Sequence, residues 1–484
     1  MSELKVHFSN FLSKKGEDFT KRNDHALLEF CSQSHISQAL ETIIKLEEEI
    51  MSNWKVRTRI LDFNNLTISI PNGTEGIKYS HKVNTERLFQ SELTSFKFEG
   101  VEDLGLTYNQ ETSTIEGIPC VNGAFKLSLL FKVEGELDHE PFNRKELNFV
   151  LNPDPKSLWK NIPSNPEAIY WKPDTRSNCE GLGTKNIVVS SKRGRSHQNV
   201  GSFRDDDYSY NYFEKTDWSV VAVADGAGSA SFSRKGSLLA CEEVIRYFTE
   251  IMPLRDFISF ETKINAYAAS NDPAMLEAAT IEAKKGLYKA TLHVHKKIHE
   301  VAEATAITHP ELFTNSKAKN NGEYFHSTLI FTAFKKFDIG YVILTFGVGD
   351  CPIGIVNANR TEAKLLNWLD VGEFGGGTRF ITQADIFHSN ERPMASRFNL
   401  HIHPDFSYLF LMTDGIYDPK FEVEANLEKN EKWLDFIADI TGVNDDNLGV
   451  DFKSADTEIQ AQLDTWMDFW SKGNHDDRTL AIIY

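Results

Sequence analysis

Carboxylates stand where the most apolar runs of this sequence begin or end. VVAVA leads to Asp225, ILTFGVG leads to Asp350 and YLFLMT leads to Asp414, while Asp476 and Asp477 directly precede the terminal run RTLAIIY. A buried strand that ends in a carboxylate places that charge at the edge of its sheet. The pattern therefore predicts that several carboxylates converge on one point.

Converging carboxylates need a partner, because their charges repel one another strongly in a low-dielectric site. A hard cation relieves that repulsion, and all-oxygen ligands suit Mg²⁺ or Mn²⁺. Gly226, which follows Asp225, would let a backbone carbonyl approach the same ion. One apolar–Asp–Gly step is usually a plain strand-to-turn transition, but three such strand ends and an Asp pair in one region favour a metal site.

The elements that must position these carboxylates lie after about residue 175, where strands and helices alternate and the helical stretches are expected at 233–251 and 272–305. Ahead of them, residues 25–54 predict a helix with one apolar stripe that includes Ile36, Ile43 and Ile50. Such a stripe is typical of a packing helix or an oligomerisation helix.

From about residue 60 to 150 the apolar residues follow a period of two, which indicates short strands. The stretch GLTYNQETSTIEGIPCVNGAFKLSLLF resembles the closing half of bacterial immunoglobulin-like domains, with Ile115, Gly117 and Pro119 as the "I-x-G-x-P" step and Gly123 in the glycine turn. The resemblance implies an all-β immunoglobulin-like sandwich that carries no catalytic group.

Proline marks the boundary between these parts, because five of the 15 prolines fall within residues 153–173. Proline fixes φ and removes a donor, so a semi-rigid linker is expected. The predicted domains are an N-terminal helical segment (1–58), the sandwich (59–150), the linker (151–174) and a C-terminal domain (175–484).

Composition excludes several classes of function. The 484 residues are 40% hydrophobic and 25% charged, which is globular, and the net charge of −18 opposes binding to nucleic acid or anionic membranes. No apolar run approaches the ~18 residues of a membrane span. The five cysteines form no CxxC spacing, so a cytoplasmic protein in a reducing compartment is expected.

The order DDDY, VADGAGS, ST, GD, TDG, DDRT resembles the metal-dependent PPM-type (type 2C) serine/threonine protein phosphatases. The similarity spans about 190–484 and implies a multidomain protein whose α+β phosphatase domain is a four-layer α-β-β-α sandwich. The matching positions are Asp205-Asp206, Asp225-Gly226-Ala227-Gly228, Ser327-Thr328, Gly349-Asp350, Thr413-Asp414-Gly415 and Asp476-Asp477-Arg478-Thr479.

The resemblance also implies the site and the reaction. A pair of Mn²⁺ or Mg²⁺ ions would be held by Asp206, Asp225, the Gly226 carbonyl, Asp414 and Asp476, and Asp350 with Asp414 would help to hold a third, weaker ion. Two such ions activate a water for in-line attack on phosphate. The expected substrate is phosphoserine or phosphothreonine on a protein, and the expected partners are that phosphoprotein and a cognate serine/threonine kinase.

Two positions depart from the family pattern. Ala227 stands where many members have a histidine that protonates the leaving group, and His197 stands where a phosphate-binding arginine is common. His197 would donate to phosphate as a pH-dependent cation, or it is an ordinary histidine whose ring is satisfied by the backbone. Arg193, Arg195 and Arg204 are competing phosphate contacts.

Other interpretations are weaker. RDDDYSYNYFEK alternates oxygens like an EF-hand, but Tyr210 replaces the required glycine, and the glycine-rich segment 372–380 contains no P-loop. A turn near the rim of the active site is expected there. The rival functions are a pseudophosphatase that binds phosphoproteins without turnover, favoured by Ala227 and His197, and a two-metal phosphodiesterase or nuclease, disfavoured by the charge of −18.

Overall fold

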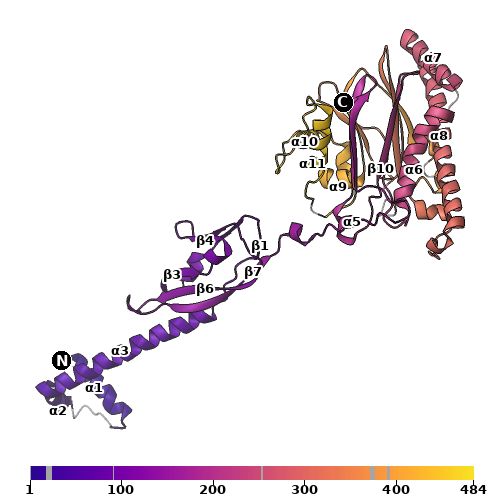
Figure 1. Cartoon of the computed structure of the whole chain (residues 1–484). Coiled ribbons are helices and arrows are strands. Elements are labelled where there is room, and N and C mark those ends of the chain that lie inside the picture. The colour runs from indigo at the N-terminus through magenta and orange to yellow at the C-terminus, as the bar shows by residue number, and fades with distance from the viewer. Residues whose placement is uncertain are drawn as a thin grey trace. The chain divides into compact units, whose positions relative to one another are not determined.

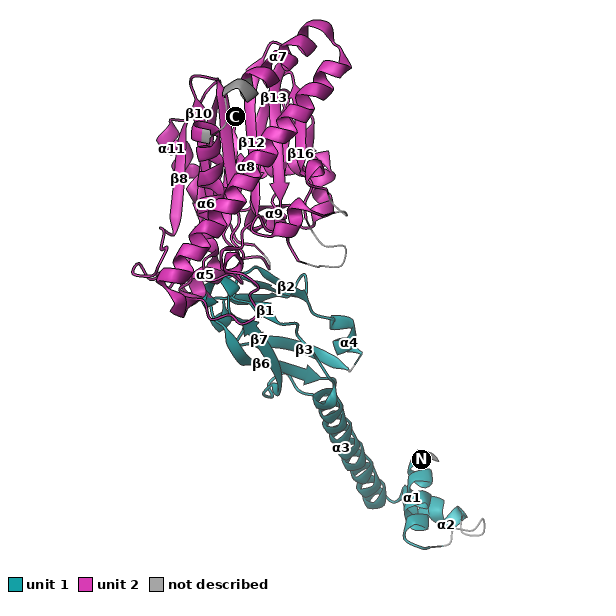
Figure 2. Cartoon of the chain, turned by 90° about the vertical axis from the view of Figure 1, so that its right-hand side faces the viewer, with its two compact units in different colours: residues 1–158 teal, residues 159–484 magenta. Residues whose placement is uncertain are grey.

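The computed structural model describes residues 2–17, 24–90, 92–251, 254–370, 377–389, 393–471 and 473–484. The chain forms two compact units, residues 1–158 and 159–484, which Figure 2 colours separately. Each unit has its own apolar core.

The N-terminal unit begins with three helices, α1 (Ser2–Lys14), α2 (Asp24–Ser32) and α3 (Ser34–Asn65), and α3 is the long indigo helix of Figure 1. The helix predicted over 25–54 is thus two helices that break at Gln33, and the second continues to Asn65. A small cluster around Leu27, Cys31 and Leu40 joins the three helices.

Two small sheets follow, and they share one core. Their strand orders are β1-β7-β6-β3 and β2-β5-β4. The elements are β1 (Gly73–Thr74), β2 (Tyr79–Lys82), α4 (Thr85–Phe89), β3 (Leu93–Glu99), η2 (Glu102–Leu104), β4 (Leu106–Asn109), β5 (Thr114–Gly117), β6 (Gly123–Val133), β7 (Asn143–Asn152) and η3 (Pro155–Leu158). The β-rich character predicted for this region is therefore present, and its immunoglobulin-like identity stays a prediction.

Two details of this region show how the sequence pattern works. Gly117, in the "I-x-G-x-P" step, has φ +148°, and a Cβ there would lie 2.5 Å from the Gly105 carbonyl oxygen, so this position requires glycine. By contrast, residues 66–72 form no strand although Leu66, Ile68 and Ile70 alternate. These three side chains pack into the core, so their alternation reflects burial and not strand pairing.

The C-terminal unit contains two sheets with an apolar core between them. Their strand orders are β10-β11-β12-β13-β16 and β15-β14-β17-β18-β9-β8. The strands are β8 (Thr175–Leu182), β9 (Lys185–Lys192), β10 (Asp207–Phe213), β11 (Trp218–Ala224), β12 (Leu329–Phe337), β13 (Gly340–Val348), β14 (Ile353–Asn357), β15 (Ala363–Leu365), β16 (Phe398–His403), β17 (Phe406–Met412) and β18 (Arg478–Ile483).

Helices cover the outer face of each sheet (Figure 1). The first sheet packs against α6 (Ser233–Arg246), α7 (Leu254–Ser270) and α8 (Pro273–Thr308), and the second against α9 (Asp414–Phe421), α10 (Asn430–Ile440) and α11 (Asp456–Trp466). The shorter pieces are α5 (Arg195–Val200), η4 (Tyr247–Ile251), η5 (Pro310–Leu312), η6 (Asn321–Phe325), η7 (Ala384–Phe387), η8 (Met394–Arg397) and η9 (Glu424–Glu428). The helices predicted at 233–251 and 272–305 are confirmed.

The Pro-rich segment differs from the expected linker in its second half. Residues 159–174 belong to the C-terminal unit, and the buried Lys172 Nζ lies 2.7 Å from the Asp206 carbonyl oxygen and 2.8 Å from Asp207 Oδ2. Tyr170 Oη also lies 2.6 Å from Thr305 Oγ1. Residues 159–174 form no helix or strand, but their polar side chains fix them to the C-terminal unit. A fragment that begins at residue 175 would therefore lose Lys172.

The helix-rich stretch 260–322 is part of the core of the C-terminal unit. Helix α8 buries a row of small and aliphatic side chains against the first sheet, and its polar side chains reach the segment 377–389 between β15 and β16. His295 Nδ1 lies 2.8 Å from the Ile381 carbonyl oxygen, and His299 Nε2 lies 2.9 Å from that of Thr382. Helix α8 therefore holds the segment 377–389 in place through these two hydrogen bonds.

Within the described residues, no helix combines the length and the apolar character that crossing a membrane requires. All five cysteines are free thiols, and four of them are buried.

Candidate active site

Five aspartates meet at one edge of the two facing sheets. Asp225 directly follows β11, Asp350 follows β13 and Asp414 begins α9 just after β17. Asp206 immediately precedes β10, and Asp476 lies two residues ahead of β18. The charges of the other four aspartates all act on Asp225, so the strand ends converge as the sequence pattern predicts.

Glycines allow the loops that carry these aspartates to approach one another. A Cβ at Gly226 would lie 2.5 Å from the Asp205 carbonyl oxygen, and a Cβ at Gly194 would lie 2.2 Å from the carbonyl carbon of Asp476. At Gly415 the distance to the Asp477 carbonyl oxygen would be 1.9 Å. Any side chain at these three positions would force the loops apart, so the site closes only because they are glycine.

Hydroxyl groups orient two of the aspartates. Thr413 Oγ1 and Thr479 Oγ1 donate to Asp206 Oδ2 over 2.8 and 2.9 Å. The Asp225 N–H donates to Thr328 Oγ1 over 2.9 Å, and the Thr328 N–H donates back to the Asp225 carbonyl oxygen over 2.8 Å. The "DDRT" step of the sequence thus orients the Asp206 carboxylate, and the "Ser-Thr" step fixes the backbone of Asp225.

These five residues form a set that we call the open carboxylates, because no described lysine or arginine forms an ion pair with them. Asp206 is buried, and the other four are partly exposed. No ion pair joins Asp206, Asp225, Asp350 or Asp414 to a basic side chain within the described part of the chain, and Asp476 has only His197 Nε2 at 4.0 Å. Burial is the main cause that raises the pKa of every member.

Mutual repulsion adds to the effect of burial. The charges of Asp477 and Asp476 help to raise the pKa of Asp206 to about 7. The pKa values of Asp225 and Asp414 lie well above the ordinary range, because each feels the charges of Asp206, Asp350 and Asp476. A group of acids in this state binds either protons or a cation.

The donor set fits a divalent cation with oxygen ligands. Asp350 Oδ1 is buried and accepts no hydrogen bond, and the same is true of Asp205 Oδ1. One oxygen of Asp225, one of Asp350 and Sγ of Cys351 lie within 4.8 Å of one another. Burial and the nearby carboxylates raise the pKa of Cys351 well above its usual value, so this thiol stays protonated and the carboxylates are the ligands that remain.

Two neighbouring aspartates, which we call the anchored carboxylates, behave in the opposite way. Asp207 Oδ2 lies 2.8 Å from Lys172 Nζ, and Asp207 Oδ1 lies 2.9 Å from Arg176 Nη1. Burial opposes its charge, but Lys172 and Arg204 outweigh that effect and lower the pKa of Asp207 to about 2. Asp207 is therefore a permanent anion that fixes the start of β10.

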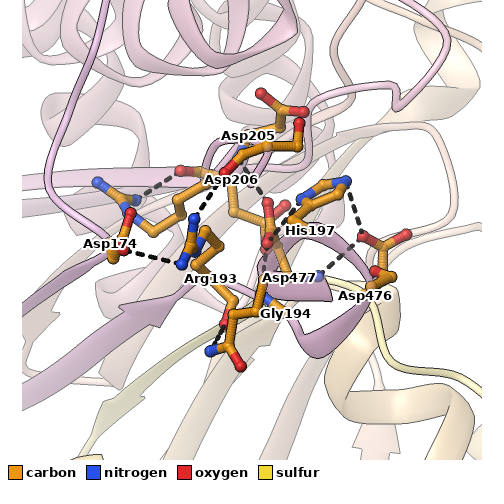
Figure 3. Close-up of polar contacts among 12 residues, drawn as sticks. Asp174, Arg193, Gly194, His197, Asp205, Asp206, Asp476 and Asp477 are labelled. Atoms are coloured by element: carbon orange, nitrogen blue, oxygen red, sulfur yellow. Dashed lines mark hydrogen bonds and ion pairs between the residues drawn. The ribbon is translucent and has the colours of Figure 1, made fainter. Parts of the chain in front are cut away.

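Asp477 is the second anchored carboxylate. It accepts hydrogen bonds from the Gly194 N–H over 2.6 Å, from the Asp205 N–H over 2.5 Å and from His197 Nδ1 over 3.0 Å (Figure 3). These donors overcome its burial and lower its pKa. Asp477 thus joins three loops of the site and is not available as a ligand.

His197 lies on α5 between the two adjacent aspartates (Figure 3). Burial opposes its positive charge, but the hydrogen bond and charge of Asp477, together with Asp205 and Asp476, raise its pKa to about 10. An imidazolium cannot ligate a metal, so His197 supplies a fixed positive charge beside the open carboxylates.

The three arginines proposed from the sequence bind backbone groups. Arg193 and Arg204 are buried, and their guanidinium groups donate to the carbonyl oxygens of Ser202 and Ile162 and of Pro173 and Asp206, respectively. These two serve the fold, so their interpretation as phosphate contacts was wrong. Arg195 donates to the Asp468 and Phe469 carbonyl oxygens over 2.6 and 3.0 Å, and its phosphate contact stays a prediction.

Sequence reasoning missed Lys172 and the orienting role of Thr413. It predicted a turn near the rim for the glycine-rich segment 372–380, and residues 372–376 of that segment lie outside the described residues. Of the rest, Thr378 Oγ1 donates to Asp350 Oδ2 over 2.7 Å. A lysine within a proline-rich stretch carries no motif, and only the tertiary structure shows that it binds a site aspartate.

Comparison with known proteins agrees with this geometry. A family model described as "Protein phosphatase 2C" matches residues 193–468, which is more than half of the chain. The fold and the acidic site thus define a phosphatase of the 2C class. The chain belongs to the protein phosphatase 2C family. The matched range includes Asp206, Asp225, Asp350 and Asp414, whereas Asp476 lies just beyond it.

Solved structures give distant matches. A bacterial serine phosphatase has 13% identity and a TM-score of 0.34, and the match covers 61% of this chain and 96% of that one. A serine/threonine phosphatase of S. agalactiae has 16% identity and a TM-score of 0.34, with 64% and 99% covered. The serine/threonine phosphatase Stp1 from Staphylococcus aureus has 14% identity and a TM-score of 0.33, and the match covers 63% of this chain and 96% of that one. No curated protein matches this sequence.

Proposed function

We propose that this protein hydrolyses phosphoserine or phosphothreonine on proteins with the help of two Mn²⁺ or Mg²⁺ ions. The observation that carries the proposal is the set of open carboxylates, five aspartates from separate strand ends that converge while the buried Oδ1 of Asp350 accepts no hydrogen bond. Burial and mutual repulsion raise the pKa of these groups, which agrees with a missing cation. When bound, such ions supply an activated water and a positive field for the phosphate.

The ligands we assign are Asp206, Asp225, the Gly226 carbonyl, Asp414 and Asp476, with Asp350 helping Asp414 to hold a third, weaker ion. The uncompensated Oδ1 of Asp350 supports its role as a ligand. Thr413 and Thr479 keep Asp206 in one orientation. Asp477 keeps the backbones of Gly194 and Asp205 close to the ligands without itself joining them.

His197 and Arg195 are the proposed contacts for the substrate phosphate. The raised pKa of His197 supports this role, because the ring stays cationic at neutral pH and its Nε2 side faces Asp476 at 4.0 Å. Ala227 offers no proton for the leaving alkoxide, so that proton comes from solvent in this proposal.

A second candidate function is a catalytically weak pseudophosphatase that binds phosphoproteins. Ala227 in place of a proton donor favours it, and the complete set of open carboxylates opposes it. In the phosphatase proposal, the C-terminal unit carries the chemistry and the immunoglobulin-like part of the N-terminal unit selects partners. We further propose a cognate serine/threonine kinase as a partner and a cytoplasmic location.

The test is steady-state kinetics on p-nitrophenyl phosphate and on a phosphothreonine peptide with Mn²⁺ present. We expect turnover of both substrates by the full chain and its loss in Asp225→Asn. Binding of the peptide without turnover would instead establish the pseudophosphatase.

A further inference from the structure

The middle of α3 has a surface that no other described part of the chain covers. Between Leu40 and Val56 every residue except Ile44 is exposed. This surface includes large apolar side chains, since Ile43, Ile50 and Trp54 are 37%, 66% and 62% exposed, and Leu61 further along is 60% exposed. Helices of globular proteins gain most of their stability from packing an apolar face, so this face calls for a partner.

The apolar face lies opposite the face that α3 already uses. Val56, Ile60 and Phe63 pack into the core of the small sheets, whereas Trp54 and Leu61 point away from it and remain exposed. At the other end, His7 Nε2 lies 3.4 Å from Glu47 Oε2, so α1 borders the exposed stretch.

The spacing along this face is that of a coiled coil. Its positions alternate by four and three residues, which is a heptad repeat with a and d sites. On the exposed stretch the a sites are Glu47, Trp54 and Leu61, and the d sites are Ile43, Ile50 and Arg57. The preceding sites of the same repeat, Ile36 and Leu40, already pack in the cluster that α3 forms with α1 and α2.

Two of these core sites are charged, and their signs determine the direction of the partner. In a parallel pair, each Glu47 would face the other Glu47 and each Arg57 the other Arg57, because a parallel coiled coil matches a with a and d with d. Like charges that meet in this way oppose association. The charges at Glu47 and Arg57 therefore disfavour a parallel homodimer.

An antiparallel pair has the opposite outcome. Glu47 and Arg57 lie equally far from position 52, and so do Ile50 and Trp54, and Ile43 and Leu61. A two-fold axis at the level of Ser52 then places each residue opposite its mirrored residue in the second copy, for example Glu47 opposite Arg57, as an isologous interface requires. Two Glu–Arg layers would flank a central pair of Ile–Trp layers.

We propose that α3 forms an antiparallel two-fold helix pair with α3 of a second copy of this chain, centred on residue 52. The charges favour a second copy of α3 as the partner. Charged residues at mirrored positions of a self-paired helix must have opposite signs, and Glu47 and Arg57 do. The inference goes beyond the phosphatase reaction and does not depend on it.

Sedimentation velocity of the full chain tests the surface. We expect the mass of a dimer for the wild type and for Ser52→Asp, whose side chain lies on the opposite side of the helix, and the mass of a monomer for Trp54→Asp. A monomeric wild type at concentrations up to about 100 μM, or a Trp54→Asp variant that dimerises like the wild type, would overturn the proposal.

A charge swap tests the pairing. Glu47→Arg alone should raise the dimer dissociation constant by about tenfold or more, because it places arginine against Arg57 of the partner subunit. The double change Glu47→Arg with Arg57→Glu should restore the wild-type constant. A double variant that dimerises no better than Glu47→Arg would contradict the mirrored register.

Cysteine cross-linking tests the direction in a Cys120→Ser background, since Cys120 is the exposed native thiol. Ile43→Cys with Leu61→Cys should give a covalent dimer, because the two positions of one helix are about 27 Å apart and cannot bridge within a chain. Ile43→Cys alone should give none. A covalent dimer from the single variant would show a parallel pair and refute the proposal.

Discussion

The open and the anchored carboxylates are the same residue type in one buried site, but their surroundings give them opposite properties. Asp206 and Asp207 are neighbours in the chain, yet the pKa of Asp206 is raised to about 7 and that of Asp207 is lowered to about 2. The difference lies in their partners. Asp206 accepts hydrogen bonds from the neutral hydroxyls of Thr413 and Thr479, whereas Asp207 forms ion pairs with Lys172 and Arg176. Burial alone therefore does not identify a carboxylate as a candidate metal ligand. A carboxylate that is buried without a lysine or arginine partner is the better candidate.

The largest effect is expected when an open carboxylate at the centre loses its charge. Asp225→Asn or Asp414→Asn should lower kcat/KM for p-nitrophenyl phosphate by about 10³-fold or more, because each removes a ligand from the proposed ion pair. Circular dichroism and the thermal midpoint of the metal-free protein should show that both variants fold, since the loss of charge relieves repulsion. Activity within tenfold of the wild type would refute the ligand assignment.

An anchored carboxylate should instead matter for folding. Asp207→Asn leaves the buried Lys172 without its counter-charge and should lower the free energy of unfolding by about 3–5 kcal/mol. Urea denaturation of the metal-free protein measures this. Asp217→Asn is the matched control, because Asp217 is an exposed turn residue on the same hairpin and asparagine tolerates its φ of +57°. Equal stability of the two variants would show that Asp207 is not an anchor.

The open and the anchored carboxylates should also change the stability of the metal-free protein in different pH ranges. Above the unfolded pKa of about 4, the folded metal-free protein keeps protons on Asp205 and Asp206, whose pKa values burial and Asp477 raise to about 7. The folded state then binds more protons than the unfolded chain, so stability falls as pH rises from about 4 to about 7. Asp207 loses its stabilising effect only below pH about 4.

Urea midpoints of the metal-free protein at pH about 5.5 and about 7.5 check this slope, and we expect the higher pH to cost about 2–4 kcal/mol. His197 adds to the loss above pH about 6.5, because its raised folded pKa makes its contribution disappear as pH approaches 10. Saturating Mn²⁺ should reverse the sign, since the ions bind the deprotonated acids. A metal-free protein that gains stability over this interval would contradict the open state of these carboxylates.

The smallest kinetic effect is expected at the edge of the open group. Asp350→Asn affects only the proposed weaker ion, so at saturating Mn²⁺ it should lower kcat/KM by about tenfold or less. At limiting Mn²⁺ the loss should be greater. If Asp350→Asn proves more damaging than Asp225→Asn at saturating metal, the order of the ligands is wrong.

The sequence predicted the open carboxylates because a strand that ends in aspartate is a local pattern. The strand-end pattern alone does not separate Asp476 from Asp477, and only the family resemblance selects Asp476. The two are adjacent, and their difference arises from the N–H groups of Gly194 and Asp205 far away in the chain. For the same reason Lys172 was assigned to a linker. Alternation at Leu66, Ile68 and Ile70 predicted a strand, but a single-chain period reports burial and not the presence of a pairing strand.

Metal titration of the full chain shows whether the open carboxylates hold the ions on which hydrolysis depends. The protein is treated with EDTA and dialysed, and Mn²⁺ is then added while calorimetry records binding and the hydrolysis of p-nitrophenyl phosphate is followed. We expect no activity without metal, recovery in step with the binding isotherm, and neither binding nor recovery in Asp225→Asn with Asp414→Asn. Activity that survives exhaustive removal of metal, or Mn²⁺ binding that persists in the double variant, would contradict the account.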